Sequence, residues 1–78
     1  MQIRKSYIQD AEAIIEFSLN DQHYLASVQK LLGEQVIRCY PQDGNGNVTD
    51  IGSVAMPQPV LDNLTEASLQ LSAKSDTL

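Results

Sequence analysis

The chain has 78 residues, of which 42% are hydrophobic and 19% are charged, and its formal net charge is −5. This composition excludes an intrinsically disordered chain, and the length corresponds to one domain with a small core, for which self-association is the expected source of further stability. The acidic balance also disfavours a nucleic-acid partner, because a phosphate backbone would be repelled by most of the surface.

The first residues do not have the apolar core of a signal peptide, and no stretch is long enough to span a membrane. We therefore expect a cytoplasmic protein without membrane contact, with a single α+β domain over residues 1–74 and a frayed polar tail over residues 75–78. Cys39 is the only cysteine. Neither an intramolecular disulfide nor a multi-cysteine zinc site is expected.

Two strands are predicted near the N-terminus, over residues 2–8 and 13–19. Ile15, Phe17 and Leu19 alternate with polar residues in the second strand, which places them on one face. A single helix over residues 6–19 is the alternative, because apolar residues there also recur at helical spacing. The β-branched and aromatic side chains favour the two strands.

The next segment, residues 21–32, is predicted to be a helix. Its apolar residues form one stripe at helical spacing, and Gly33 follows where a left-handed helix end is expected. The stripe consists of Tyr24, Leu25, Val28, Leu31 and Leu32. The alternative is a hairpin turn at Asn20 and Asp21 that leads into a strand over residues 24–28.

Residues 34–56 carry the strongest hairpin signal. A strand over residues 35–40 is followed by the turn-forming residues 41–47 and by a return strand over residues 49–56. A bulge at Gly52 and Ser53 would bring Ile51 and Val54 into phase, so that they pack with Ile37 and its neighbours.

The turn at residues 43–49 resembles the middle of an EF-hand calcium loop, with Asp43 and Asn45 at two ligand positions. Pro41 stands where the loop needs its first carboxylate, and Gly52 stands where it needs its last. The flanking segments are strands and not helices. The sequence therefore predicts a plain turn without a metal.

A second helix is predicted from Pro59 to about Ala73, because proline suits the first turn of a helix. Its core stripe consists of Val60, Leu64, Ala67 and Leu71. Three further residues, Leu61, Thr65 and Leu69, form a separate ridge that the stripe does not include. We refer to these three as the helix ridge and predict that it contacts a second copy of the chain or a partner protein.

Together these elements predict an α+β fold of order ββαββα, with a small antiparallel four-stranded sheet and both helices on one face. The alternatives are an N-terminal helix, or a four-stranded meander with one C-terminal helix.

No convergent catalytic set is present: His23 is interpreted as a surface imidazole and Cys39 as a buried thiol. We expect no enzyme activity and no cofactor. The predicted function is a small protein-interaction or regulatory module that self-associates. The alternatives are an acidic decoy for a nucleic-acid-binding protein, and an enzyme or ion-binding subunit.

Overall fold

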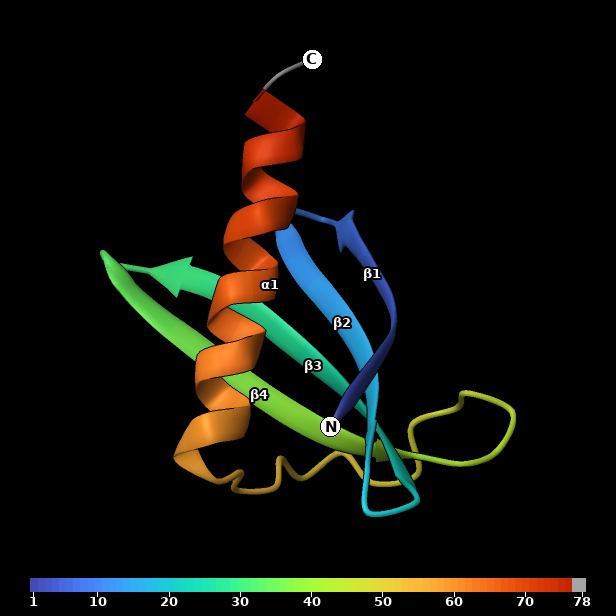
Figure 1. Ribbon diagram of the computed structural model, residues 1–78. Coiled ribbons are helices and arrows are strands. Elements are labelled where there is room, and N and C mark those ends of the chain that lie inside the picture. Colours follow the sequence, from blue (N-terminus) through green and yellow to red (C-terminus); the bar gives the residue numbers. More distant parts are fainter. Residues whose placement is uncertain (77–78) are drawn as a thin grey trace.

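The structure, a computed structural model, describes residues 1–76. It consists of four strands and one long helix: β1 (Gln2–Gln9), β2 (Glu12–Leu19), β3 (Gln22–Leu31), β4 (Glu34–Gln42) and α1 (Gln58–Asp76). The strands form one antiparallel meander in the order β1-β2-β3-β4, and α1 lies across one face of it (Figure 1). The fold is thus the meander with one C-terminal helix that the sequence analysis gave as an alternative. The ββαββα order with two helices is wrong.

Each of the three hairpins closes through two residues with positive φ, the geometry of a type I′ turn, which matches the twist of the strands that it joins. The pairs are Asp10 and Ala11 (φ 51° and 65°), Asn20 and Asp21 (52° and 65°), and Leu32 and Gly33 (52° and 82°). Leucine is unusual at such a position, because its side chain crowds the left-handed backbone.

The helix predicted over residues 21–32 is therefore a strand, and the alternative of a turn at Asn20 and Asp21 is correct. Tyr24 pairs with Phe17 of β2 and Ala26 pairs with Ile15, so β3 alternates its side chains between the two faces. β3 is also longer than the alternative strand over residues 24–28, because it extends to Leu31. The next hairpin then leads directly into β4.

The return strand predicted over residues 49–56 is also absent, although the segment follows the outer edge of β4. The backbone N–H of Thr49 donates to the carbonyl of Pro41 at 3.0 Å, and that of Val54 donates to the carbonyl of Cys39 at 2.8 Å. Between these two contacts the Asp50 carboxylate accepts the N–H of Gly52 at 2.8 Å and forms a local turn. That turn displaces the chain from the edge of β4, so a regular strand does not form.

The core lies between α1 and the sheet. Phe17, Ile15 and Leu64 are fully buried there, and the Phe17 ring stacks on Tyr24 with ring centres 5.5 Å apart. The remaining buried residues of this cluster are Ala13, Ala26, Val28, Cys39 and Val60. We call this the covered face of the sheet.

The C-terminal helix agrees with the sequence analysis in its start and in its apolar stripe. It begins next to Pro59, and the N–H groups of Val60 and Leu61 donate to the carbonyl of Pro57. All four predicted stripe residues contribute to the core. The helix extends to Asp76, and residues 77–78 of the predicted tail lie outside the described residues. Over residues 1–76, no helix has both the length and the apolar character needed to span a membrane.

Candidate interaction surfaces

The face of the sheet opposite α1, which we call the open face, has no helix over it. A register shift between Ile3 and Lys5 in β1 inserts Arg4 as an extra residue. Arg4 and Lys5 consequently both point toward the open face, where the Arg4 guanidinium reaches the side chain of Gln42. Strand alternation places further residues on this face, among them Tyr7, Glu12, Ile14, Glu16, Ser18, His23, Leu25, Ser27, Gln29, Arg38 and Tyr40.

A depression of about 390 Å³ lies on the open face. Ile14 and Leu25 belong to its apolar part, and the loop after β4 contributes Val48 and Ile51 to its lining. Ile51 is 95% exposed, although it belongs to the lining of this depression. The remaining lining residues are Glu12, Ser27, Gln29, Arg38 and Tyr40. The sequence analysis missed this surface because it read β3 as a helix, which hides the alternation that places Leu25 beside Ile14.

Gln42, at the end of β4, joins the loop to the open face. Its side chain is only 3% exposed, and its Nε2 donates to Glu16 Oε1 at 2.8 Å and to the Gly46 carbonyl at 2.9 Å. Its Oε1 accepts a hydrogen bond from Arg4 Nη2 at 2.8 Å. All three contacts satisfy a buried amide and hold the loop against the sheet.

The loop itself is organised by Asp43. Its Oδ1 accepts the backbone N–H groups of Asn45 and Asn47, each at 2.9 Å, and these bonds hold the pKa of Asp43 below its ordinary value of 3.8. The carboxylate that resembles a calcium ligand in the sequence therefore caps the turn. Among the described residues, no three His, Cys, Asp or Glu side chains form a metal-binding group.

Lys5 and Tyr7 lie side by side at the β1 edge of the open face. The Lys5 Nζ lies 5.2 Å from the centre of the Tyr7 ring, within the range of a cation–π contact. Desolvation, and secondarily the charge of Glu16, raise the pKa of the Tyr7 hydroxyl. This edge of the open face thus carries an oriented cation on an aromatic ring.

The predicted helix ridge lies on the side of α1 that faces β4. Thr65 Oγ1 accepts a hydrogen bond from Gln35 Nε2 of β4 at 2.9 Å and donates to the Leu61 carbonyl at 2.9 Å. Leu61 and Thr65 are half-buried, and Leu69 is 59% exposed beside a hollow of about 360 Å³ that it shares with Lys30 and Gln35. The ridge therefore exposes one large apolar side chain, that of Leu69.

His23 and Cys39, interpreted from the sequence as a surface imidazole and a buried thiol, lie on opposite faces of the sheet. His23 pairs with Ser18 and Gln42 on the open face. Cys39 is buried on the covered face, where burial raises the pKa of its thiol. The sheet separates the two side chains, so the imidazole has no access to the thiol.

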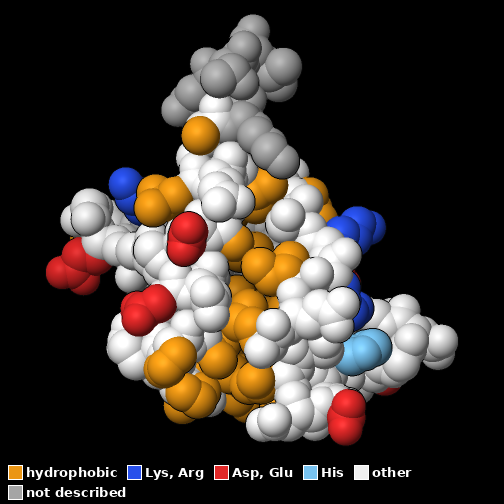
Figure 2. Space-filling model, viewed as in Figure 1, with side chains coloured by type: hydrophobic (Ala, Val, Ile, Leu, Met, Phe, Trp, Pro, Cys, Tyr) orange, Lys and Arg blue, Asp and Glu red, His pale blue; other side chains and the backbone are white. Residues whose placement is uncertain are grey.

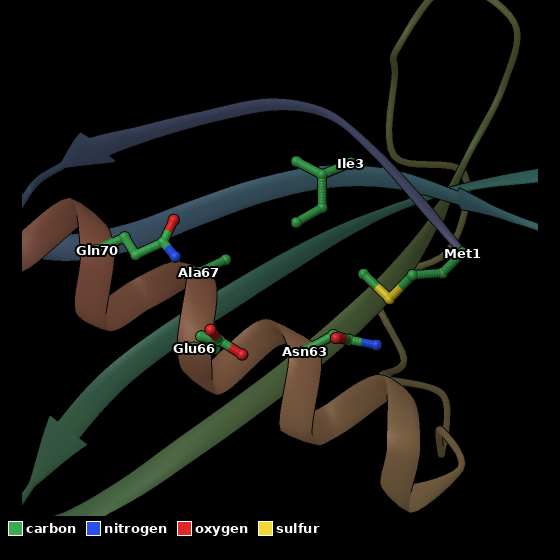
Figure 3. A pocket seen from close by; sticks show the side chains of 6 residues that line it. All are labelled: Met1, Ile3, Asn63, Glu66, Ala67 and Gln70. Carbon is green, nitrogen blue, oxygen red and sulfur yellow. The ribbon is translucent and has the colours of Figure 1, made fainter.

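A groove of about 300 Å³ runs between α1 and the N-terminal half of β1 (Figure 3). Met1, Ile3 and Ala67 provide its apolar surface, and the rim on α1 carries polar side chains. These rim residues are Asn63, Glu66 and Gln70. The space-filling view shows hydrophobic side chains along the boundary between α1 and β1 (Figure 2). The groove is open to solvent along the free edge of the sheet.

No protein-family model, curated protein sequence or solved structure matches the chain. The functional argument therefore depends on the surfaces described above.

Proposed function

We propose that this chain is a small protein-interaction module that uses the open face of its sheet as the contact surface. The observation that carries the proposal is the exposure of Ile51 and Val48 beside the apolar depression formed by Ile14 and Leu25. Apolar side chains that a folded chain holds in water, next to an apolar hollow, are typical of a surface that a second molecule covers.

The charges around the depression support the same function. Arg38 and Glu12 belong to its lining and bring both signs of charge to its rim. An apolar centre with a polar rim is the usual anatomy of a protein–protein contact. The rim charges set the orientation of the partner, and the apolar centre supplies most of the affinity.

The size of the surface is also sufficient. A stable contact buries about 800 Å² on each partner. The whole chain exposes 5285 Å², so such a contact would cover about one seventh of it. One face of a four-stranded sheet with its adjoining loop provides an area of that order.

A second copy of the chain is the first partner to test, because a chain of 78 residues gains stability from any additional apolar burial. We retain the helix ridge as the second candidate surface for this dimer, since Leu69 remains exposed on it. Ile51→Glu and Leu69→Glu place the same charge on the two surfaces and are matched controls for one another.

Sedimentation velocity from low to high micromolar concentration distinguishes the two surfaces. We expect the wild-type chain to associate, Ile51→Glu to shift it to monomer, and Leu69→Glu to leave it associated. The opposite pattern would assign the dimer to the helix ridge. Circular dichroism must show both variants folded, because unfolding would also abolish association.

A partner other than a second copy is tested with a photo-crosslinking residue at position 51 in the native host. A specific crosslinked protein, absent when the same group is placed at the exposed Gln58, would support the module. A chain that is monomeric by sedimentation and gives identical crosslinks from both positions would contradict it.

The alternative of an acidic decoy requires carboxylates gathered on one surface. The acidic side chains visible beside α1 form separate patches (Figure 2). Glu12 and Glu16 lie near basic residues of the open face, since Glu12 shares the depression with Arg38 and Gln42 links Glu16 to Arg4. The interaction module is thus the better supported function.

A further inference from the structure

The outer edge of β1 has backbone groups that the fold leaves without a partner strand. β1 pairs only with β2 and is the first strand in the sheet order. The two-residue turn makes Gln9 and Glu12 a hydrogen-bonded pair, so the backbone groups of Ser6 and Ile8 point away from β2. Outside the sheet ladders, no backbone hydrogen bond among the described residues involves either residue.

The other sheet edge differs from this one. Along β4, the N–H groups of Thr49 and Val54 already use the carbonyls of Pro41 and Cys39. The chain thus covers the C-terminal part of its β4 edge, at Cys39 and Pro41, with its own backbone, whereas no such segment of the described residues lies along β1. Free N–H and C=O groups in strand geometry are matched best by another extended backbone.

The side chains next to this edge define what the added strand would carry. Toward α1, Ile3 and Ile8 are 42% and 45% exposed, and Ile3 continues into the apolar groove with Ala67. Side chains of an added strand that point to this side would pack on apolar surface. Because neighbouring residues of a strand point to opposite faces, every second residue of the added strand should be apolar.

The side chains that point toward the open face meet a different environment. Lys5 lies at that edge, with its ammonium held over the Tyr7 ring. A carboxylate on the added strand would complement this cation. The intervening residues of the added strand should therefore be acidic.

We propose that β1 accepts an extended segment of a partner protein as a fifth strand, with aliphatic side chains toward α1 alternating with acidic side chains beside Lys5. This site is separate from the depression on the open face, and either proposal can fail alone. Free backbone groups, an adjacent apolar groove and an oriented cation all favour the same occupant.

A second copy of β1 is a poorer occupant than such a segment. The strand carries Arg4 and Lys5 and no acidic residue, so a copy would bring further positive charge and no carboxylate to this edge. The register shift at Ile3 and Lys5 also bends the strand and limits regular pairing to its second half. These features select against indiscriminate pairing and leave Lys5 to Gln9 as the stretch of regular pairing, which the apolar groove at Ile3 adjoins.

The test is a selection from a display library of random nine-residue peptides against the full chain. We expect enriched peptides that alternate aliphatic and acidic residues. When an enriched peptide is titrated, the amide resonances of Ser6 and Ile8 should shift in the NMR spectrum and exchange more slowly with solvent. Amides around Leu25 and Tyr40 on the open face should not change.

Two variants make the proposal falsifiable. Ser6→Pro removes an outward N–H without removing a bond to β2, so it should weaken binding about tenfold, while Ser6→Ala should change it less than about twofold. Lys5→Glu should replace the preference for acidic peptides with a preference for basic peptides. This variant tests the site even if Ser6→Pro does not fold.

Several outcomes would overturn the proposal. These are a selection without enrichment, enriched peptides without alternation, equal binding by the Ser6→Pro chain, or no change of charge preference in Lys5→Glu. Sedimentation of the wild type and of Ser6→Pro tests a further outcome. If the wild type self-associates and Ser6→Pro does not, the occupant of the β1 edge is a second copy of the chain, and the proposal of a partner segment is overturned.

Discussion

The two faces of the sheet are built from alternate residues of the same strands, yet they are stabilised by different chemistry. On the covered face, Ile15 and Phe17 are sealed by Leu64 of α1 in contacts that are entirely apolar. On the open face, the buried Gln42 amide links Arg4, Glu16 and the loop through directional hydrogen bonds. Most of the free energy of folding should therefore come from the covered face, since apolar burial is the dominant favourable term.

The open face satisfies its polar groups but leaves apolar side chains in water. Ile51 contributes little to the packing of the chain, because it is almost fully exposed. The backbone on either side of it is attached to β4, through the N–H groups of Thr49 and Val54. A residue that is held in place without being buried is available for contact. The covered face thus provides most of the stability, and the open face is the surface for which we propose binding.

The largest expected effect comes from breaking the covered face. Phe17→Ala removes a fully buried ring and its stack on Tyr24, and should lower the free energy of unfolding by about 3–5 kcal/mol. Ile51→Ala, as the matched change beside the open face, should alter it by less than about 0.5 kcal/mol. Urea unfolding followed by circular dichroism measures both. Similar losses in the two variants would contradict the division between the faces.

The next effect comes from Gln42. Gln42→Leu keeps the approximate size of the side chain but removes the donors to Glu16 and to the loop, and it leaves Arg4 Nη2 with the Phe17 carbonyl as its acceptor. We expect a loss of about 1–3 kcal/mol in the free energy of unfolding, because part-buried polar groups lose their partners. Gln42→Glu retains the acceptor for Arg4 and loses the two donors, but it also sets a second carboxylate against Glu16, so repulsion should add to its loss of stability. Unchanged stability in Gln42→Leu would show that the network does not stabilise the fold.

A smaller effect is expected at Cys39, which tests the polar tolerance of the covered face. Cys39→Ser places a hydroxyl among apolar side chains and should reduce the free energy of unfolding by about 1–2 kcal/mol. The native thiol should react slowly with a bulky thiol reagent, because the side chain is buried and its pKa is raised. Cys39→Ala is the control without a hydroxyl. Rapid labelling of the folded chain would place Cys39 at the surface.

Some of this fold could be predicted from the sequence, and the reasons for the failures are physical. The alternation in β2 is clear because one face is apolar and the other mostly polar. In β3, Tyr24 packs on the covered face while Leu25 lies on the open face beside the loop. Adjacent apolar residues that point to the two faces of one strand imitate one stripe of a helix.

The turns added to that ambiguity. The apolar stripe predicts a helix end at Gly33, but in the structure Gly33 is the second residue of the turn between β3 and β4. Both structures need a residue with positive φ, so the glycine does not distinguish them. Asn20 likewise suits a helix cap or a type I′ turn. Local propensity could not decide between strand and helix here, because the decision depended on pairing with β2.

The candidate surfaces were less predictable than the fold. The exposure of Leu69 follows from the helical phase alone, and that part of the helix-ridge prediction agrees with the structure. The exposure of Ile51 depends on a local bond between Asp50 and Gly52 that turns the chain away from β4. The register shift that brings Arg4 toward Gln42 leaves no pattern in the sequence. Such features depend on contacts between distant segments.

The smallest effect concerns the loop on the open face and its Asp43 carboxylate. The pKa of Asp43 is lowered in the folded chain, so the ionised carboxylate favours the folded loop. Its contribution is fully present above the ordinary pKa of 3.8 and is lost as the pH falls through the lower pKa of the folded state. Protection of the Asn45 and Asn47 amides against exchange, relative to the intrinsic rate at each pH, should therefore fall at acid pH in the wild type. Asp43→Asn keeps an acceptor oxygen but does not titrate, so the same fall in protection there would exclude Asp43 as its cause.

Added calcium should not change the melting temperature, because Asp43 Oδ1 already accepts two N–H groups and Pro41 and Gly52 offer no carboxylate. A rise of several degrees at sub-millimolar calcium would contradict this assignment and would make the loop a cation site.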